Sequence, residues 1–411
     1  MKLAIKLNSR PMNIEDRERF NFEFSNIYFA CLLVLVWGMR FIDSYLQIFV
    51  SKLPYVAYVS SFVLPFLTIV FALLSCEYIL RAIRRSDVVF LLGFGIVYVI
   101  NLAMFESNFP YLLSKAFGLW LIAIPLYFVG LRIDLRRDLD VLYTVSILNL
   151  VGYTVVSMLS NKFLASVSGG DMYLAYNLLP HVCLLIYYGF SNKWLLGKAF
   201  AIAGFCMILF LGNRGSMICM FAFILLYLFF FRTYKHRVVV YSALVCGSGV
   251  FLHFYYSIVG AVRDIAFNMG LSTRVFDRVL DGSFFVSLGR NNIKDRLLQA
   301  IHERPFIGYG MGSDHTIAGS YAHNFILELW TAFGVIIGSL IVAIVFWIII
   351  RGIRKGKEDK ERGFILLLSC SVMIKLMLSG TYLDEIYFFF LMGICVGTAR
   401  KSKQRRNKII I

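Results

Sequence analysis

Long apolar segments alternate with short polar ones along most of the chain. A helix needs about 17 to 25 mainly apolar residues to cross the hydrocarbon core of a bilayer. By this criterion the sequence predicts about twelve transmembrane helices, near residues 25–39, 54–80, 87–105, 111–130, 141–160, 172–190, 196–212, 214–231, 238–258, 324–350, 363–379 and 383–399. We therefore expect an all-α, multi-pass integral membrane protein.

The composition agrees with this class. Hydrophobic residues make up 59% of the chain and charged residues only 16%, whereas about a quarter of the residues in a soluble domain are charged. No polar stretch is long enough to fold as a separate unit, so residues 1–411 are expected to form a single polytopic membrane domain. The eight cysteines fall in apolar segments without metal-site spacing, which predicts small buried hydrophobes rather than disulfide partners.

The charge pattern predicts an orientation. The formal net charge of +17 comes mainly from short basic clusters in every second connection, of which Arg84, Arg136, Lys235 and Arg354 are members. Such clusters mark cytoplasmic connections, which argues against nucleic acid as a partner. We expect a protein of the bacterial inner (plasma) membrane with both termini in the cytoplasm.

One polar segment, residues 257–322, is too long for this alternation, and its position places it on the outer, periplasmic side. Four of its apolar residues recur at helical spacing, namely Ile293, Leu297, Leu298 and Ile301. This spacing predicts a helix that ends before Pro305 and lies on the membrane surface or over a cavity. The glycine-rich turn at 308–312 then allows a close approach of the backbone to a neighbour.

Cations gather in and near this segment. It contains six arginines, namely Arg263, Arg274, Arg278, Arg290, Arg296 and Arg304. They would either neutralise the neighbouring aspartates or bind an anion, because guanidinium groups match phosphate oxygens in a bidentate way. Arg214 lies in a short outer hairpin, where a charge is a candidate for function and snorkelling toward headgroups is the alternative.

Other polar residues near the predicted helices receive ordinary interpretations. Arg40, Lys115 and Lys375 fall near outer helix ends, where snorkelling is the expected role. His181 lies in the middle of a predicted span, next to Pro180, and is expected to be a hydrogen-bonded core histidine.

The sequence from Tyr321 to Glu328 gives the sharpest chemical signal. His323 would lie at the outer N-terminus of the tenth predicted span, where the helix dipole disfavours the imidazolium form. A neutral histidine in this place could act as a general base, although a plain N-terminal residue is the alternative. Asn324 would cap the helix or orient a sugar hydroxyl, and Glu328 would pair with a cation.

These residues resemble the O-antigen polymerase and ligase superfamily (Wzy/WaaL type). The similarity comprises an arginine, an amphipathic stretch, a proline and a Gly-x-Gly turn within 290–312, then His-Asn-x-x-Leu-Glu at 323–328 and Gly-hydrophobic-hydrophobic-Gly at 334–338. Asn213-Arg214-Gly215 resembles the family's earlier Arg-Gly element. The matching residues cover about a third of the chain, and their order and sidedness make the resemblance fairly specific.

The resemblance implies a GT-C-like glycosyltransferase that works at the periplasmic face without a metal or other cofactor. Its implied partners are undecaprenyl-pyrophosphate-linked glycans as donor and acceptor, the lipid bilayer and, where one exists, a chain-length regulator. The implied roles are His323 as catalytic base and Arg214 and Arg290 as pyrophosphate ligands, with Arg263 and Arg278 as reserves. Asn324, Glu328 and Asp384 would support them.

Three functions remain open on the sequence. A polymerase would join lipid-linked repeats, and the high content of Phe, Tyr and Ile favours it. A ligase would transfer the glycan to lipid A–core with nearly the same parts. A flippase or transporter would also have about a dozen spans, but it usually shows repeated halves and charges at the midplane, and neither is evident here.

Overall fold

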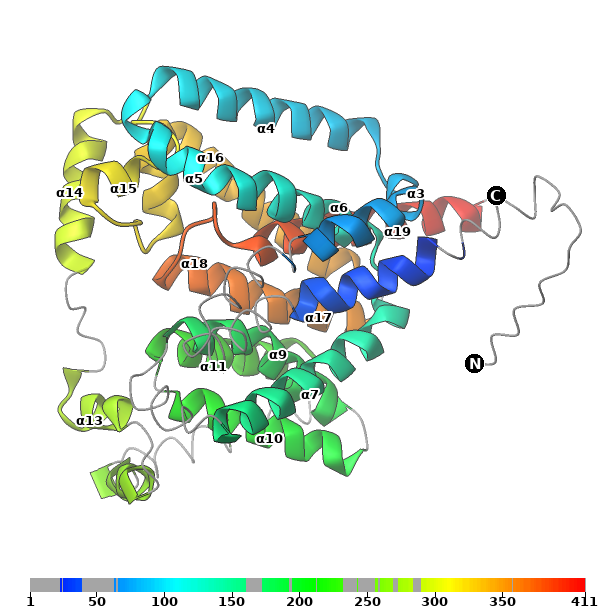
Figure 1. The fold of residues 1–411 in the computed structure, drawn as a ribbon, viewed down its shortest axis with the longest axis vertical. Coiled ribbons are helices and arrows are strands. Elements are labelled where there is room, and N and C mark those ends of the chain that lie inside the picture. The colour runs from blue at the N-terminus through cyan, green and yellow to red at the C-terminus, as the bar shows by residue number, and fades with distance from the viewer. Residues whose placement is uncertain are drawn as a thin grey trace, which may run out of the picture.

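The computed structural model describes residues 25–38, 66–159, 172–191, 194–211, 213–231, 259–268, 273–283, 290–356 and 358–410, together with residues 23, 63, 242, 256 and 257. Within these ranges the protein is all-helical and contains no strand (Figure 1). The elements with defined bounds are α3 (Cys76–Leu80), α4 (Arg85–Met104), η1 (Glu106–Asn108), α5 (Phe109–Gly118), η2 (Leu119–Ala123), α6 (Ile124–Arg132), α7 (Leu135–Leu159), α9 (Met172–Ser191), α10 (Leu195–Phe210), α11 (Arg214–Phe231), α13 (Arg274–Leu280), α14 (Arg290–Glu303), α15 (Ser313–Ala318), α16 (Phe325–Lys355), α17 (Asp359–Ser369), η4 (Cys370–Ile374), α18 (Lys375–Leu378) and α19 (Ile386–Ile410).

Four helical stretches of the described chain are long and apolar enough to cross a membrane: Arg85–Met104, Glu106–Arg132, Arg214–Phe231 and Phe325–Lys355. Each coincides with a predicted span. The prediction of about twelve spans is confirmed only to this extent, and the GT-C-like architecture stays a prediction. The predicted span at 238–258 lies almost wholly outside the described residues, as does Arg40.

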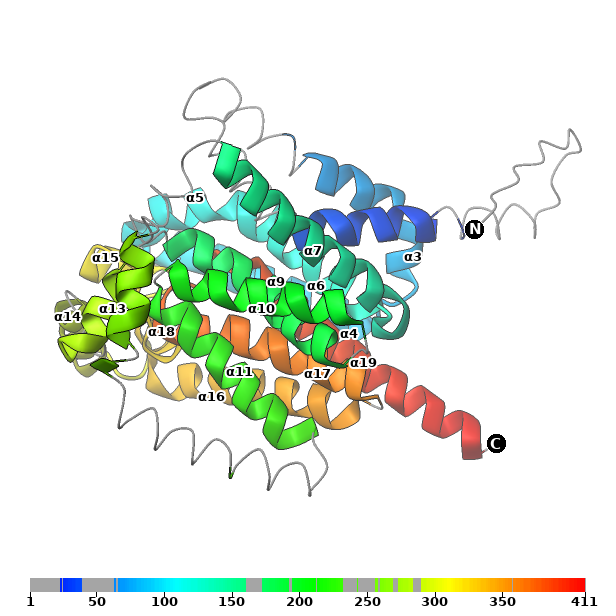
Figure 2. The ribbon, with the colours of Figure 1, turned by 90° about the horizontal axis from the view of Figure 1, so that it is seen from below.

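The core forms where α19 packs between α6 and α16, next to α17 (Figures 1 and 2). Glycines bring the backbones of α6 and α19 together: a Cβ on Gly130 would lie 2.5 Å from the carbonyl oxygen of Phe390. Close backbone approach of this kind is typical of helices that pack within membranes. All seven of the cysteines described are free thiols. Four are buried as predicted, whereas Cys76 and Cys206 are half-buried and Cys31 is exposed.

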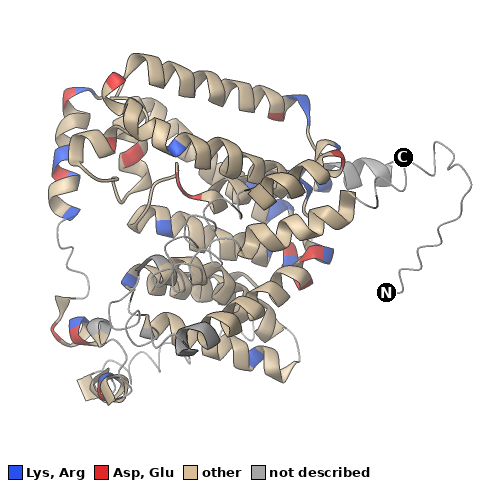
Figure 3. Cartoon of the chain, viewed as in Figure 1, with Lys and Arg blue, Asp and Glu red and all other residues tan. Residues whose placement is uncertain are grey.

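Charged residues gather near the two ends of the long helices (Figure 3). At one end the basic connections contact one another: the guanidinium of Arg136 lies 3.0 Å from Glu358, and that of Arg400 lies 2.6 Å from Asp87. At the opposite end lie α14 and α15 (Figure 1). Among the described residues, these basic connections therefore lie at the end opposite α14 and α15.

The predicted helix after residue 290 is confirmed as α14, which spans Arg290–Glu303. Leu297 and Ile301 are buried in a small second core with Ala322 and Leu327, whereas Leu298 is exposed. This second core fixes α14 and α15 against the first turns of α16. The described parts of 257–322 thus contain ordered helices, and their apolar faces attach them to the bundle.

The glycine-rich turn after Pro305 docks on a break in α16. Gly334 has φ 77° and ψ 167°, a backbone conformation that glycine alone adopts readily. The break frees carbonyl groups of α16, and the N–H groups of Tyr309 and Gly310 donate to the carbonyls of Thr331 and Ala332 at 2.8 and 2.9 Å. A Cβ on Gly308 would lie 2.7 Å from the backbone of Ala332, which explains the glycine there.

Candidate functional site

Tyr176 of α9 lies at the centre of a polar cluster at the α14 end of the bundle. Its hydroxyl bonds with Ser379, in the loop after α18. A methyl group on Gly215, at the start of α11, would overlap that same hydroxyl. The Tyr321 hydroxyl lies 3.5 Å from the Ser379 hydroxyl. Segments that are distant in the sequence therefore meet at one tyrosine.

Two cations, Arg290 and Lys375, lie close to this tyrosine, and a third, Arg214, directly precedes the Gly215 that contacts it. Arg214 begins α11, directly before Gly215, and its guanidinium donates to the carbonyl of Ser283 at 3.4 Å. Arg290 begins α14 and donates to the carbonyl of Leu378 at 2.8 Å, one residue before Ser379. The ammonium of Lys375 lies 5.4 Å from the centre of the Tyr176 ring and pairs with Glu385. The cluster carries a positive charge that suits an anion.

His323 borders the same cluster. Its ring centre lies 4.1 Å from that of Tyr321, and its buried Nδ1 makes no hydrogen bond within the described protein. Burial and, second, the positive charge of Arg290 lower the pKa of His323 from 6.5 to about 4. The predicted neutral form is therefore the form at pH 7. The neutral form is caused by burial and by Arg290, and not by the helix dipole that we expected. The expectation failed because Asn324, and not His323, caps α16.

The backbone at His323 is strained. Its φ of 53° makes it the one described non-glycine residue with a positive φ, a conformation that tends to occur at functional sites. The carboxylate of Asp314, in α15, helps to hold it there by accepting the N–H of Ala322 at 2.7 Å. Burial raises the pKa of Asp314. Asp314 therefore acts on His323 as a positioning residue.

Two of the predicted supporting residues have structural roles. The side chain of Asn324 accepts the N–H groups of Ile326 and Leu327 at 3.0 and 3.2 Å, so the capping role is confirmed. The expectation that Glu328 pairs with a cation is wrong for the described residues. Glu328 is only 2% exposed, and its carboxylate accepts the hydroxyl of Thr381 and the N–H of Tyr382.

The remaining predicted residues lie outside the Tyr176 cluster. Arg263 pairs with Asp264 at 3.1 Å and with Asp277 at 2.8 Å, which is the charge-neutralising role. Arg278 is half-buried on α13, near Asp281. Asp384 is bound to the ammonium of Lys115 at 2.6 Å.

Sequence reasoning missed several members of the cluster. Tyr176 and Ser379 gave no local signal, because they lie in or beside apolar segments. Lys375 did give a local signal, because a lysine within a predicted span is a candidate for function. Its pairing with Glu385 shows that snorkelling was the wrong interpretation. Lys115 is likewise ion-paired rather than snorkelling. His181, by contrast, is the core histidine expected, with Ser146 at 3.1 Å.

The sequence matches no protein-family model, no curated protein and no solved structure. A neutral imidazole beside Arg290, at the border of the Tyr176 cluster, offers a proton acceptor next to an anion site. This arrangement is suited to a transfer reaction in which the leaving group is an anion and the attacking group loses a proton.

Proposed function

We propose that the protein is a membrane glycosyltransferase that uses a lipid pyrophosphate as its leaving group. More particularly, we propose an O-antigen polymerase, which joins undecaprenyl-pyrophosphate-linked repeats at the periplasmic face of the bacterial inner membrane. The observation that carries the proposal is a neutral His323 beside Arg290, at a cluster where Arg290, Lys375 and the start of α11 approach Tyr176. The motif resemblance and the segregation of basic connections support it.

The cations serve the leaving group. As the bond from the anomeric carbon to the pyrophosphate oxygen breaks, its electron pair stays on that oxygen and negative charge grows there. Cations that are preorganised around this oxygen stabilise the transition state more than the ground state. The loss of one such hydrogen-bond donor typically lowers the rate by about a hundredfold to a thousandfold. Arg290 and Arg214 would supply them, with the Lys375–Glu385 pair behind.

His323 would serve the attacking group. The acceptor hydroxyl forms the new bond to the anomeric carbon from the opposite face, which inverts its configuration, and its proton passes to the imidazole. A pKa of about 4 makes His323 fully neutral but weakly basic at pH 7. A pyrophosphate bound beside Arg290 would offset that positive charge and raise the pKa of His323. The base would thus become stronger when the donor is bound.

The test uses purified protein in nanodiscs with a lipid-linked repeat, scored for a ladder of polymers. We expect His323→Ala to lose activity by about a hundredfold or more. The matched control is His302→Ala, which removes an exposed histidine from α14. Normal ladders from His323→Ala would overturn the assignment of the base, and transport without ladders from the wild type would favour a flippase.

Cells distinguish the polymerase from the ligase. Loss of a polymerase leaves single repeats on lipopolysaccharide, whereas loss of a ligase leaves none. A deletion strain that shows no O-antigen at all would therefore replace the proposed polymerase by the ligase. The catalytic roles of His323 and Arg290 would be the same in both.

A further inference from the structure

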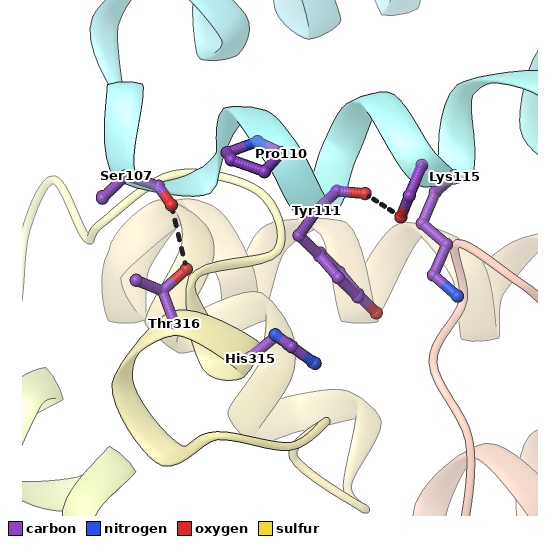
Figure 4. Close-up of a pocket in the computed structure, with 7 residues that line it drawn as sticks. Ser107, Pro110, Tyr111, Lys115, His315 and Thr316 are labelled. Carbon is purple, nitrogen blue, oxygen red and sulfur yellow. Dashed lines mark hydrogen bonds between the residues drawn. The ribbon is translucent and has the colours of Figure 1, made fainter.

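An open cavity of about 610 Å³ lies between α5 and α15 at the same end of the bundle as the Tyr176 cluster (Figure 4). This volume is within the range of small-molecule sites. Its walls come from Ser107, Pro110, Tyr111, Lys115, His315 and Thr316, with Ser114 beside Lys115. The hydroxyl of Thr316 donates to the carbonyl of Ser107 at 3.5 Å and to the side chain of Asn108 at 2.9 Å, which joins the two walls.

The lining combines aromatic faces with hydrogen-bonding groups. The rings of Tyr111 and His315 stack with centres 4.4 Å apart and an interplanar angle of 12°. Ser114, Thr316 and His315 are exposed residues. The hydroxyls of Ser114 and Thr316 donate to the carbonyl of Tyr111 and the side chain of Asn108, so their oxygens serve as acceptors. A pyranose ring matches such a surface, because its C–H face packs on an aromatic ring and its hydroxyls donate to acceptor oxygens.

The charge of the lining favours a neutral ligand. The ammonium of Lys115 is already bound to the carboxylate of Asp384 at 2.6 Å, so its positive charge is locally balanced. The cluster around Tyr176 differs, because the guanidinium of Arg290 there donates to the backbone carbonyl of Leu378. An anionic pyrophosphate is thus better matched to the Tyr176 cluster and a polyhydroxylated neutral group to the cavity.

Two short segments connect the cavity with the Tyr176 cluster and with His323. The loop from Ser379 to Glu385 contacts Tyr176 through its first residue, while Asp384 near its end binds Lys115 beside the cavity. The second segment runs from Asp314 to His323, and the carboxylate of Asp314 at its start accepts the N–H of Ala322 near its end. The two places therefore belong to one continuous framework.

We propose that the cavity between α5 and α15 binds a sugar residue of the glycan, at a distance from the reacting pyrophosphate bond. This inference rests on the proposed function, since the glycan is the substrate of that reaction. Such a subsite would hold the growing or incoming glycan in register while the Tyr176 cluster holds the pyrophosphate. It would also let the enzyme select repeats by sugars that do not react.

The test measures binding without chemistry. The probe is the lipid-free oligosaccharide of one repeat, released from the surface polysaccharide of the source cell, titrated calorimetrically into protein in nanodiscs. Ser114→Trp places a large ring in the cavity from an exposed position, and we expect it to weaken binding at least tenfold. Leu113→Trp adds the same ring at the neighbouring, 56% exposed position, which does not line the cavity, and should change affinity less than twofold.

Further variants separate this inference from the proposed function. His315→Ala removes one stacked ring without filling the cavity and should weaken binding about threefold or more. His323→Ala should bind the oligosaccharide like the wild type while it fails to make ladders. A wild type that does not bind the oligosaccharide, or equal affinities for Ser114→Trp and Leu113→Trp, would overturn the sugar site. A wild type that binds the oligosaccharide but makes no ladders would support the site and refute the polymerase.

Discussion

Replacing Arg290 by glutamine should move the acid limb of the pH–rate profile and lower the rate at pH 7. In the wild type the pKa of His323 lies near 4 because of burial, the larger cause, and the charge of Arg290. Removal of that charge favours the imidazolium form, so the pKa of His323 rises. The acid limb of kcat/KM, which reports the free enzyme, should therefore move to higher pH.

The size of this shift is bounded. The pKa of His323 is lowered from 6.5 to about 4, a difference of about 2.5. Arg290 contributes less than half of this lowering, because burial is the larger cause. We expect the limb to move by about 0.3 to 1 pH unit, where one unit corresponds to about 1.4 kcal/mol. At pH 7, where His323 is neutral in both proteins, the loss of a preorganised charge should lower kcat by about a hundredfold.

The assay measures ladder formation in nanodiscs between pH 4 and 8 for the wild type, Arg290→Gln and Arg296→Gln. Arg296 lies in the same helix but is exposed, so Arg296→Gln should match the wild type in rate and in pH profile. An acid limb that stays in place or moves to lower pH in Arg290→Gln would refute the proposed coupling between Arg290 and His323. Equal rates for the two arginine variants would refute the role of Arg290 at the leaving group.

Three further predictions concern stability and the reserve arginine. Gly334→Ala should lower the free energy of unfolding by more than about 1 kcal/mol, because φ is positive and the new Cβ would overlap the carbonyl of Phe306. Denaturation in detergent would show this. Gly93→Ala, at a helical position with open space, is the control that should not lose stability. Asn324→Ala should cost about 1 kcal/mol through loss of the cap, and Asn324→Asp should restore most of it in the same measurement. Arg263→Gln should leave the rate of ladder formation within about twofold, because exposed ion pairs contribute little; a loss as large as that of Arg290→Gln would contradict its assignment to charge neutralisation.

The local sequence was a sufficient guide to several parts of the site. Helical spacing together with Pro305 identified α14, and the position of Asn324 before an apolar segment identified the cap of α16. These features depend on neighbours within about one turn, and the chain's local pattern records them directly. The neutrality of His323 was also predicted, although burial and Arg290, rather than the helix dipole, are its causes.

Contacts between distant segments were beyond the reach of such patterns. Tyr176 and Ser379 are separated by about two hundred residues, and each lies in or next to an apolar segment that gives no sign of the other. Lys375 and Glu385 looked like separate charges, but the fold makes them a buried pair. Glu328 could not be assigned correctly, because its partners lie in the loop before α19.

By itself, the sequence determined that this protein is helical and rich in apolar segments of membrane-spanning length. It also determined that the basic connections are separate from the 257–322 segment, and that His323 directly precedes Asn324, the cap of α16. Hydrophobic length, charge alternation and capping are properties of short stretches of chain. The tertiary structure alone decided that α16 breaks at Gly334, that Arg290, Lys375 and the start of α11 meet at Tyr176, and that a cavity lies between α5 and α15. Those outcomes depend on which helices pack together, because a hydrogen bond or ion pair between distant residues forms only once packing has brought them into contact.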